Sequence, residues 1–185
     1  RVRTVEPFGN GLINDTFLVT TNKDSWVLQR INSAVFSHPE RIMRNLALLS
    51  AHLAKGPQVG LRVPALIPAA DGNSFLRGAD GDLWRLMELI ENARALDRLD
   101  SLAQAQEVGR ALGVFHRLVR DIPPQRLAIT LPGFHATPDY LQRFLQVYRR
   151  DADSNCPPEI RGAAAFAAAR RTAVDVLEEA RRSAR

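Results

Sequence analysis

The 185-residue sequence has a single cysteine, few aromatic residues and no long apolar run. The lone Cys156 cannot form a disulfide within the chain, which suits a reducing compartment such as the cytoplasm. No apolar stretch reaches the length needed to cross a membrane, and residues 1–6 lack the pattern of a signal peptide. These absences predict a cytoplasmic globular protein with no membrane partner.

The sequence also lacks the usual short motifs for binding phosphate. It has no Gly-x-Gly-x-x-Gly fingerprint and no Gly-Lys-Ser/Thr loop, and its only lysines are Lys23 and Lys55. Positive charge comes almost entirely from arginine, with a net charge of +5 and a pI near 10.3.

A basic chain invites the hypothesis of a nucleic-acid partner. The arginines are dispersed and partnered by acidic residues, and no aromatic residues are interleaved among them to stack on bases. The densest cluster shares its helix with Asp175, Glu178 and Glu179, at spacings that allow pairing within the helix. That cluster consists of Arg170, Arg171, Arg181, Arg182 and Arg185. We therefore expect no nucleic-acid partner. The alternative interpretation of the basic composition is a helical protein that binds nucleic acid through its arginines.

The most informative segment is the opening, residues 7–19, in which Gly9 and Gly11 flank Asn10. Glycines let the backbone turn sharply and come close to a ligand. Residues 12–19 are rich in β-branched and aromatic types and can pair with residues 26–31 through a turn at 22–24. The pattern predicts a glycine-containing hairpin that leads into a strand. An ordinary hairpin without a ligand is the alternative.

A helix is predicted over residues 35–53, with Ser37 and Glu40 spaced as a capping box and Pro39 in the first turn. Its apolar face consists of Ile42, Met43, Leu46, Leu49 and Leu53. Short strands are predicted at 63–67 and 74–77, followed by a longer strand over 83–91 that ends at a hinge near Asn92.

The second half of the sequence is predicted to be helical. Asp100 is expected to cap a helix in which Gly109 and Gly113 allow close approach of a neighbouring helix. The apolar face of that helix consists of Leu102, Ala105, Val108, Leu112, Phe115 and Val119. After a proline-containing linker, a helix begins after Thr137, and a last helix is expected over residues 163–185.

Taken together, these motifs resemble the aminoglycoside phosphotransferase and choline kinase superfamily, and within it the bacterial N-acetylhexosamine 1-kinases. The resemblance rests on four segments: Glu6–Val19, Val27–Asn32, the helix start from Val35 to Leu46, and Trp84–Glu91. It implies an α+β, kinase-like fold. Residues 1–91 would form a small lobe of antiparallel sheet and one helix, and residues 92–185 the helical beginning of a large lobe.

The resemblance further implies that ATP lies between the two lobes, with Mg²⁺ as its metal. Backbone amides of a glycine turn suit phosphate oxygens because no side chain intervenes. The phosphate contacts would come from Gly9, Asn10, Gly11, Asn14 and Thr16. The adenine would be held by the hinge backbone at Glu88, Leu89 and Ile90.

The sequence departs from the family pattern in two places, on the strand over residues 26–31 and at Leu12 in the opening segment. Kinase-like folds place a Lys on the strand that follows the glycine hairpin, and this Lys pairs with a Glu on the next helix. In this sequence the corresponding strand carries Gln29 and Arg30 instead. Neighbouring strand residues point to opposite faces, so we expect Gln29 to face inward and bond Asn45, with Arg30 as the alternative. Leu12 stands where the sugar kinases usually carry a substrate-contacting His, so it is the candidate substrate residue.

The resemblance also implies an acceptor-orienting Asp in a His-x-Asp loop and a further Asp for Mg²⁺. None of the four histidines begins such a loop. We therefore expect an amino-terminal part of a longer kinase, inactive alone, with its metal ligands after Arg185. The acceptor implied is a small molecule, most closely a sugar hydroxyl. The alternatives are an aminoglycoside, choline or homoserine kinase-like phosphotransferase and a non-catalytic nucleotide-binding module.

Overall fold

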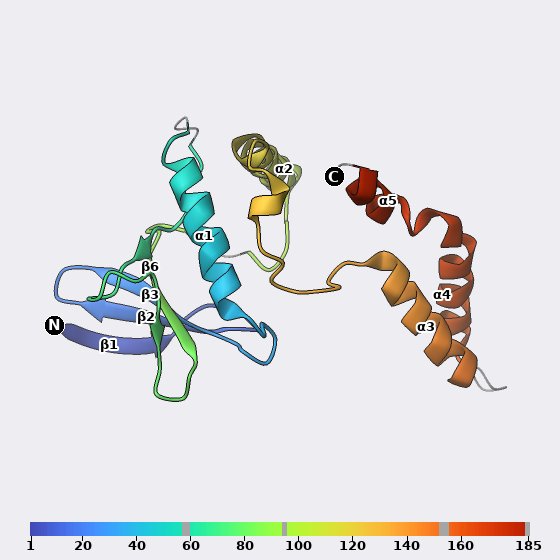
Figure 1. Ribbon diagram of the computed structural model, residues 1–185, viewed down its shortest axis with the longest axis horizontal. Coiled ribbons are helices and arrows are strands. Elements are labelled where there is room, and N and C mark those ends of the chain that lie inside the picture. The colour runs from blue at the N-terminus through green and yellow to red at the C-terminus, as the bar shows by residue number, and fades with distance from the viewer. Residues whose placement is uncertain (57–59, 94–95, 152–155, 184–185) are drawn as a thin grey trace. The chain divides into compact units, whose positions relative to one another are not determined.

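A computed structural model describes residues 1–56, 60–93, 96–151 and 156–183 of the chain (Figure 1). The chain divides into two compact units, Arg1–Thr130 and Leu131–Arg185. The first unit contains the predicted small lobe, the hinge and one helix beyond it. The predicted lobe boundary after Glu91 lies inside this unit and stays a prediction.

Within the described residues, six strands form one antiparallel sheet with the order β1-β2-β3-β6-β4, and β5 also pairs with β6. The strands are β1 Val2–Pro7, β2 Asp15–Thr21, β3 Ser25–Ile31, β4 Leu66–Ile67, β5 Leu76–Arg77 and β6 Leu83–Glu88. The hairpin turn predicted at 22–24 joins β2 to β3, so that part of the prediction is confirmed. Strand β1, which pairs with β2, was not predicted.

The described helices are α1 Pro39–Leu53, α2 Leu102–Val119, α3 Thr137–Asp151, α4 Pro158–Ala169 and α5 Val176–Ser183. Two short 3₁₀ turns, η1 Pro124–Arg126 and η2 Arg171–Ala173, complete the set of described helical elements. None of the described helices is long and apolar enough to cross a membrane.

The first turn of α1 differs from the predicted capping box. The N-cap is His38, it makes no side-chain cap hydrogen bond, and Pro39 begins the helix. Proline suits this position because its missing N–H would have no partner in the helix. The Glu40 carboxylate forms an ion pair with Arg77 of β5 instead of reaching back to Ser37. The start of α1 is therefore tied to the sheet through an ion pair.

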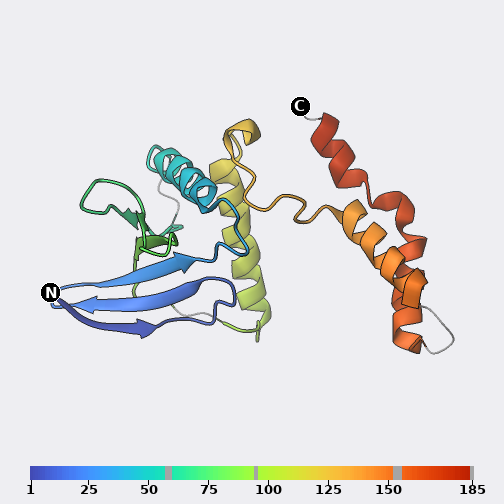
Figure 2. The ribbon, with the colours of Figure 1, turned by 60° about the horizontal axis from the view of Figure 1, so that its bottom comes forward.

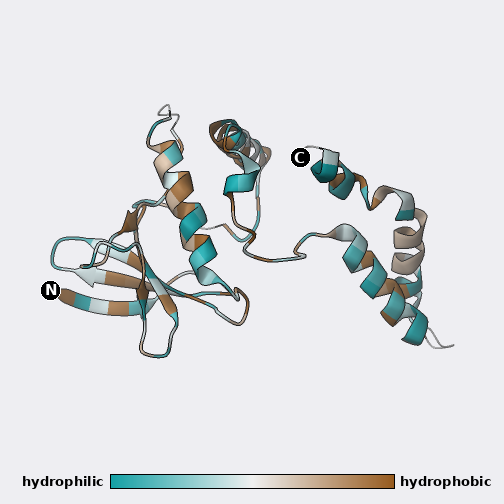
Figure 3. Cartoon of the chain, in the orientation of Figure 1, coloured by the Kyte–Doolittle hydropathy of each residue, from teal (hydrophilic) through white to brown (hydrophobic). Residues whose placement is uncertain are grey.

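One face of the sheet is covered by α1, and we call it the α1 face (Figures 1 and 2). Its buried centre consists of Ile31 of β3, Leu83 of β6 and Met43 of α1. The partly buried side chains packed around them are Phe36, Ile42, Leu46, Leu66 and Phe75. Hydrophobic and hydrophilic bands alternate along α1, as expected of a helix with one covered side (Figure 3). Burying each large apolar side chain is worth roughly 1.5–3 kcal/mol, so this cluster fixes α1 to the sheet.

Helix α2 departs from the sequence prediction at its start and along its surface. Its N-cap is Ser101, whose hydroxyl accepts the Gln104 backbone N–H, and not Asp100. A Cβ built on Gly109 or Gly113 would meet no described atom within 4 Å, so no described helix approaches there. Leu102 is 75% exposed, and Val114, outside the predicted apolar face, is the buried residue.

The second unit contains α3, α4 and α5. The start of α3 at Thr137 agrees with the prediction, and the Phe144 and Tyr148 rings stack along it with centroids 6.0 Å apart. The predicted continuous last helix is wrong, because α4 ends at Ala169 and η2 precedes α5. β-branched Thr172 and Val174 lie in this break, and such residues favour the helix less than the alanines before them. Arg185 lies outside the described residues.

Candidate functional site

The glycine-containing opening forms the loop between β1 and β2. The Phe8 N–H donates to the Thr16 carbonyl oxygen at 2.9 Å and closes the base of the loop. Strand β2 begins at Asp15 and not at Leu12 as predicted, so the loop is longer than expected. Gly9 has a φ of +79°, whereas Gly11 does not adopt the left-handed region. The sharp turn therefore depends on Gly9.

The carboxamide of Asn14 ties the end of this loop to the end of β3. The Asn32 N–H donates to Asn14 Oδ1 at 3.0 Å, and Asn32 Nδ2 donates to the Ile13 carbonyl oxygen at 3.0 Å. The loop tip is open by contrast, since Leu12 is 99% exposed. Asn10 makes one long contact, from its Nδ2 to Asp97 Oδ1 at 3.5 Å. The loop thus has a fixed base and an accessible tip.

The side chains of Gln29 and Arg30 lie on opposite faces of the sheet, as the alternation of a strand requires. Gln29 lies in β3, and its cross-strand neighbours are Thr16 in β2 and Arg85 in β6. Gln29 Nε2 donates to Thr16 Oγ1 at 2.9 Å. Arg85 donates to Gln29 Oε1 through Nε at 3.0 Å and Nη2 at 2.5 Å. Because Ile31 shares the face of Gln29, this row of polar side chains belongs to the α1 face.

Arg30 on the other face is held by two carboxylates. Its guanidinium contacts Asp15 Oδ2 at 2.5 Å and Asp82 Oδ2 at 3.0 Å, and its Cζ lies 5.9 Å from the centroid of a Trp84 ring. The hydrogen bond to Asp15 is the main cause that raises the pKa of Arg30, and the charge of that carboxylate adds to it. Arg30 is therefore already neutralised by its neighbours.

Arg85 has the opposite environment, and sequence reasoning did not single it out. Its side chain is half-buried, and the only described hydrogen-bond partner of its guanidinium is the neutral amide of Gln29. No described carboxylate lies within ion-pair distance of its guanidinium. Burial lowers the pKa of Arg85 from its ordinary value. The signal that could have found it is strand alternation, which places Arg85 on the inward face of β6.

The predicted hydrogen bond between Gln29 and Asn45 is wrong. Asn45 Nδ2 donates to the Ala128 carbonyl oxygen at 2.8 Å, and the Ala128 N–H donates to Asn45 Oδ1 at 2.8 Å. A side-chain amide matches the donor and acceptor of one backbone residue, so it is satisfied there. Asn45, the expected partner of Gln29, therefore binds the segment after α2. No strand or helix pattern in the sequence marked that segment.

A cavity of about 680 Å³ opens beside this row, within the first unit. Its polar lining includes Asn14 from the opening loop, Asn45 from α1 and Arg85 from β6. Apolar residues such as Phe115 and Val119 of α2 form much of the remaining wall. Arg120 at the end of α2 and Thr130 also line this cavity. The structure therefore brings polar side chains from distant parts of the sequence to one cavity, and two of them, Asn14 and Asn45, were predicted site residues.

Strand β6 ends at Glu88 and not at Glu91 as predicted, so the predicted adenine contacts begin with the last residue of β6. The Glu88 N–H donates to the Ala65 carbonyl oxygen at 2.9 Å, and the Glu88 carboxylate forms an ion pair with Arg62. Within the described residues, Leu89 and Ile90 form no backbone hydrogen bond outside the helices and strands. The chain then turns at Asn92, which has a φ of 57°. The Glu88 amide is thus occupied, while the two following residues retain backbone groups for a ligand.

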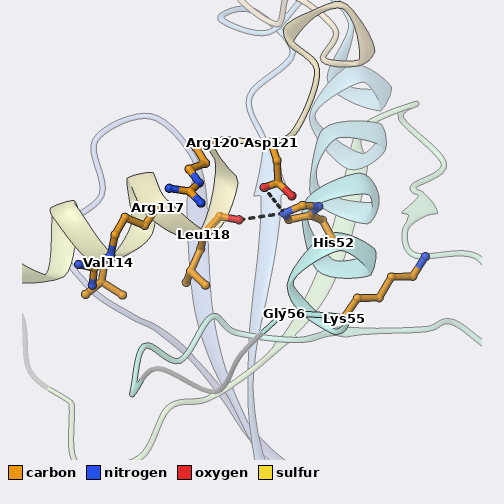
Figure 4. Close-up of a pocket in the computed structure, with 8 residues that line it drawn as sticks. All are labelled: His52, Lys55, Gly56, Val114, Arg117, Leu118, Arg120 and Asp121. Carbon is orange, nitrogen blue, oxygen red and sulfur yellow. Dashed lines mark hydrogen bonds and ion pairs between the residues drawn. The ribbon is translucent and has the colours of Figure 1, made fainter.

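A second cavity, of about 660 Å³, lies between the C-terminal ends of α1 and α2 (Figure 4). His52 Nε2 lies 2.8 Å from the Leu118 carbonyl oxygen and 3.2 Å from Asp121 Oδ1. Lys55 points away from this pair (Figure 4). The basic side chains around the cavity do not converge on one point, so His52 acts here as a link between the two helices.

Within the described residues, no group of three or more His, Cys, Asp or Glu side chains is arranged to hold a metal ion. The expected Mg²⁺ ligands therefore stay a prediction about other residues.

The comparisons with known proteins agree with the kinase-like fold. The model of the phosphotransferase enzyme family (APH) matches residues 4–183. A homoserine kinase from Cupriavidus necator is 30% identical over 154 residues, which cover 80% of this chain and 44% of that protein. The solved structure of a microcompartment-associated aminopropanol kinase is similar with a TM-score of 0.55 at 18% identity, covering 80% of this chain and 51% of that one.

The chain belongs to the phosphotransferase enzyme family. This confirms the resemblance to the aminoglycoside phosphotransferase and choline kinase superfamily, and the structural similarity confirms the α+β kinase-like fold. The closer resemblance to N-acetylhexosamine 1-kinases stays a prediction. The chain spans about half the length of the proteins it matches. The assignment of individual residues to ATP stays a prediction.

Proposed function

We propose that this chain forms the nucleotide-binding part of a kinase that transfers the γ-phosphate of ATP to a hydroxyl group of a small molecule. The observation that carries the proposal is the Thr16–Gln29–Arg85 row on the α1 face, next to a glycine loop with a fixed base and an open tip. The loop amides and the guanidinium offer donors to phosphate oxygens, and the Leu89 and Ile90 backbone offers donors and acceptors to adenine.

The Asn10, Gly11 and Asn14 positions would contribute to the phosphate site through loop amides or short polar side chains. Bound Mg²⁺ would neutralise phosphate charge during transfer. Since the sequence contains no His-x-Asp loop, we also propose that residues 1–185 alone do not transfer phosphate. The intact protein is therefore the proper subject of an activity assay, with the 185-residue chain as its comparison.

Two acceptor classes are proposed, each with its own support. The opening motif resembles that of N-acetylhexosamine kinases, which favours a sugar hydroxyl, although Leu12 replaces the His expected there. The homoserine kinase relative favours an amino-alcohol hydroxyl. An exposed apolar side chain such as Leu12 offers no hydrogen bond to a sugar hydroxyl, so we place the amino alcohol first.

The decisive experiment is an ADP-release assay on the intact protein with ATP and Mg²⁺. Homoserine, aminopropanol and N-acetylhexosamines are supplied separately, and a reaction without acceptor is the control. Acceptor-dependent ADP release would support the kinase proposal, and the accepted substrate would identify the class. If ATP neither binds nor turns over with any acceptor, the proposed function is wrong.

A further inference from the structure

Two arginines lie on neighbouring strands near the opening loop, and only one of them has carboxylate partners. Arg30 is paired with Asp15 and Asp82 on one face of the sheet. Arg85, on the α1 face, has no described carboxylate within reach and bonds only the Gln29 amide oxygen. A guanidinium stays charged in proteins, so Arg85 carries an uncompensated positive charge beside a cavity.

Leaving such a charge half-buried without an anion is unfavourable. Removing a charge from water costs free energy unless an opposite charge or hydrogen bonds replace the lost hydration. The lowered pKa of Arg85 reflects this desolvation. Gln29 compensates only in part, because a neutral amide oxygen is a weaker partner than a carboxylate or phosphate. The site is therefore suited to an anionic ligand that completes it.

The direction of the guanidinium is fixed by its neighbours. Two of its nitrogen atoms, Nε and Nη2, donate to Gln29 Oε1, and Gln29 is in turn held by Thr16 at the start of β2. A guanidinium has more N–H groups than these two contacts use. The remaining N–H groups of Arg85 are free of described protein partners, and Arg85 lines the cavity together with Asn14 of the opening loop. Arg120 at the end of α2 lines the same cavity, but only Arg85 is linked through Gln29 to Thr16 beside that loop.

We propose that Arg85 is the cation that binds the nucleotide phosphates in this protein, with Gln29 as the positioning residue that aims its guanidinium. In kinase-like folds this charge usually comes from a lysine on the strand that here carries Gln29. The charge is thus supplied from β6, one strand across the sheet, while Gln29 links it to the glycine loop. This inference rests on the proposed nucleotide site and adds the residue that provides its charge.

The experiment compares ATP with adenosine, which lacks phosphates, by calorimetric titration of the intact protein. Arg85→Met removes the charge while keeping an unbranched side chain, and it should weaken ATP binding about tenfold or more, as expected for loss of a charged hydrogen-bond partner. Adenosine binding should not change. Arg85→Lys keeps the charge without the planar fork, so it should retain part of the ATP affinity.

Arg110→Met is the matched control, because Arg110 is an exposed arginine on α2 paired with Glu107. It should bind both ligands as the unmodified protein does. If Arg85→Met binds ATP normally, or loses ATP and adenosine to the same extent, the proposal for Arg85 is overturned while the nucleotide site stands. Absence of binding by the unmodified protein would instead overturn the nucleotide site and this inference with it.

A measurement on the unmodified protein covers the case in which Arg85→Met does not fold. The Nε–H resonance of Arg85, assigned by comparison with Arg85→Lys, should shift when ATP is added and stay in place with adenosine. An ATP-induced shift would support direct phosphate contact. An unchanged resonance at saturating ATP would contradict it.

Discussion

The side chain of Asn45 forms two hydrogen bonds with the backbone of Ala128, one in each direction and both 2.8 Å long. The two residues are separated by 83 positions, and they connect the middle of α1 to the segment that follows α2. Arg41, one turn earlier on α1, donates to the neighbouring Ile129 carbonyl oxygen at 3.1 Å. This segment is therefore attached to α1 through its backbone, which explains why a linker without a strong pattern has a defined path.

Asn45→Ala should destabilise the first unit. It leaves the N–H and carbonyl of Ala128 without partners in a partly buried place, which costs about 1–3 kcal/mol. The free energy of unfolding in urea measures the loss. Ser50→Ala, an exposed position on the same helix, is the control and should change stability little. Equal stability of Asn45→Ala and the unmodified protein would show that these hydrogen bonds contribute nothing.

Gly9→Val and Gly11→Val should have different effects on the opening loop. Gly9 has a φ of +79°, a conformation that costs a β-branched residue about 1–3 kcal/mol. A Cβ on Gly11 would meet only the Asn14 carbonyl oxygen, at 3.9 Å. We expect Gly9→Val to lower the thermal midpoint, whereas Gly11→Val keeps it. A greater loss of stability in Gly11→Val would show that the left-handed turn is wrongly placed.

Substitutions of Gln29 and Arg30, neighbours in β3, should have different effects on ATP binding and on stability. Gln29→Ala removes the acceptor that orients Arg85 and should weaken ATP binding more than Arg30→Ala does. Arg30→Ala breaks the links to Asp15 and Asp82 and should lower the melting temperature. Titration with ATP and thermal melts of both variants give the comparison. The reverse result, with ATP affinity lost only in Arg30→Ala, would place the phosphates on the opposite face of the sheet.

The pH dependence of stability should include contributions from Asp71 and Glu107. The Asn73 backbone N–H is the largest cause that lowers the pKa of Asp71, and a hydrogen bond from Arg110 does the same for Glu107. A carboxyl group whose pKa is lower in the folded than in the unfolded state stabilises the fold at pH values above its unfolded-state pKa. This stabilisation is lost as the pH falls through the folded-state pKa. The loss should begin below about pH 4.

Carboxyl titration followed by NMR checks this, with Asn73→Ala as the test variant. Removing the Asn73 side chain takes away its hydrogen bond to Asp71 Oδ2 but keeps the backbone contact. The pKa of Asp71 should rise part of the way toward its ordinary value, and that of Glu107 should not move. A pKa of Asp71 unaffected by Asn73→Ala would assign the whole shift to the backbone.

The parts of the fold that could be predicted from sequence depend on local patterns. The β2–β3 hairpin follows from its turn residues and β-branched strands, and the body of α1 from the apolar spacing of Ile42, Met43 and Leu46. The extents of β4 and β5 were overestimated, because each is a two-residue bridge to β6 whose length depends on pairing. The break after α4 was missed because no Gly or Pro marks it.

The candidate site shows the same limit. Strand alternation alone separated Gln29 from Arg30, and the structure agrees with that separation. The partner of Gln29 could not be found this way, because Arg85 is 56 positions away and reaches it only through the pairing of β3 with β6. Asn45 was assigned to the wrong partner because the competing acceptor, Ala128, lies in a segment with no recognisable pattern.

The pairing of β3 with β6 also has a consequence for the order of folding. Strands β1, β2 and β3 follow one another along the chain with short connections, whereas β6 joins β3 only after more than fifty intervening residues close into a loop. Loop-closure entropy makes local pairings faster than distant ones. We expect the three-stranded meander to form first and Arg85 to reach Gln29 late. Pulse-labelled hydrogen exchange would then show β2 amides protected before those of β6, and a newly synthesised chain would acquire the complete Thr16–Gln29–Arg85 row only after its hinge has emerged.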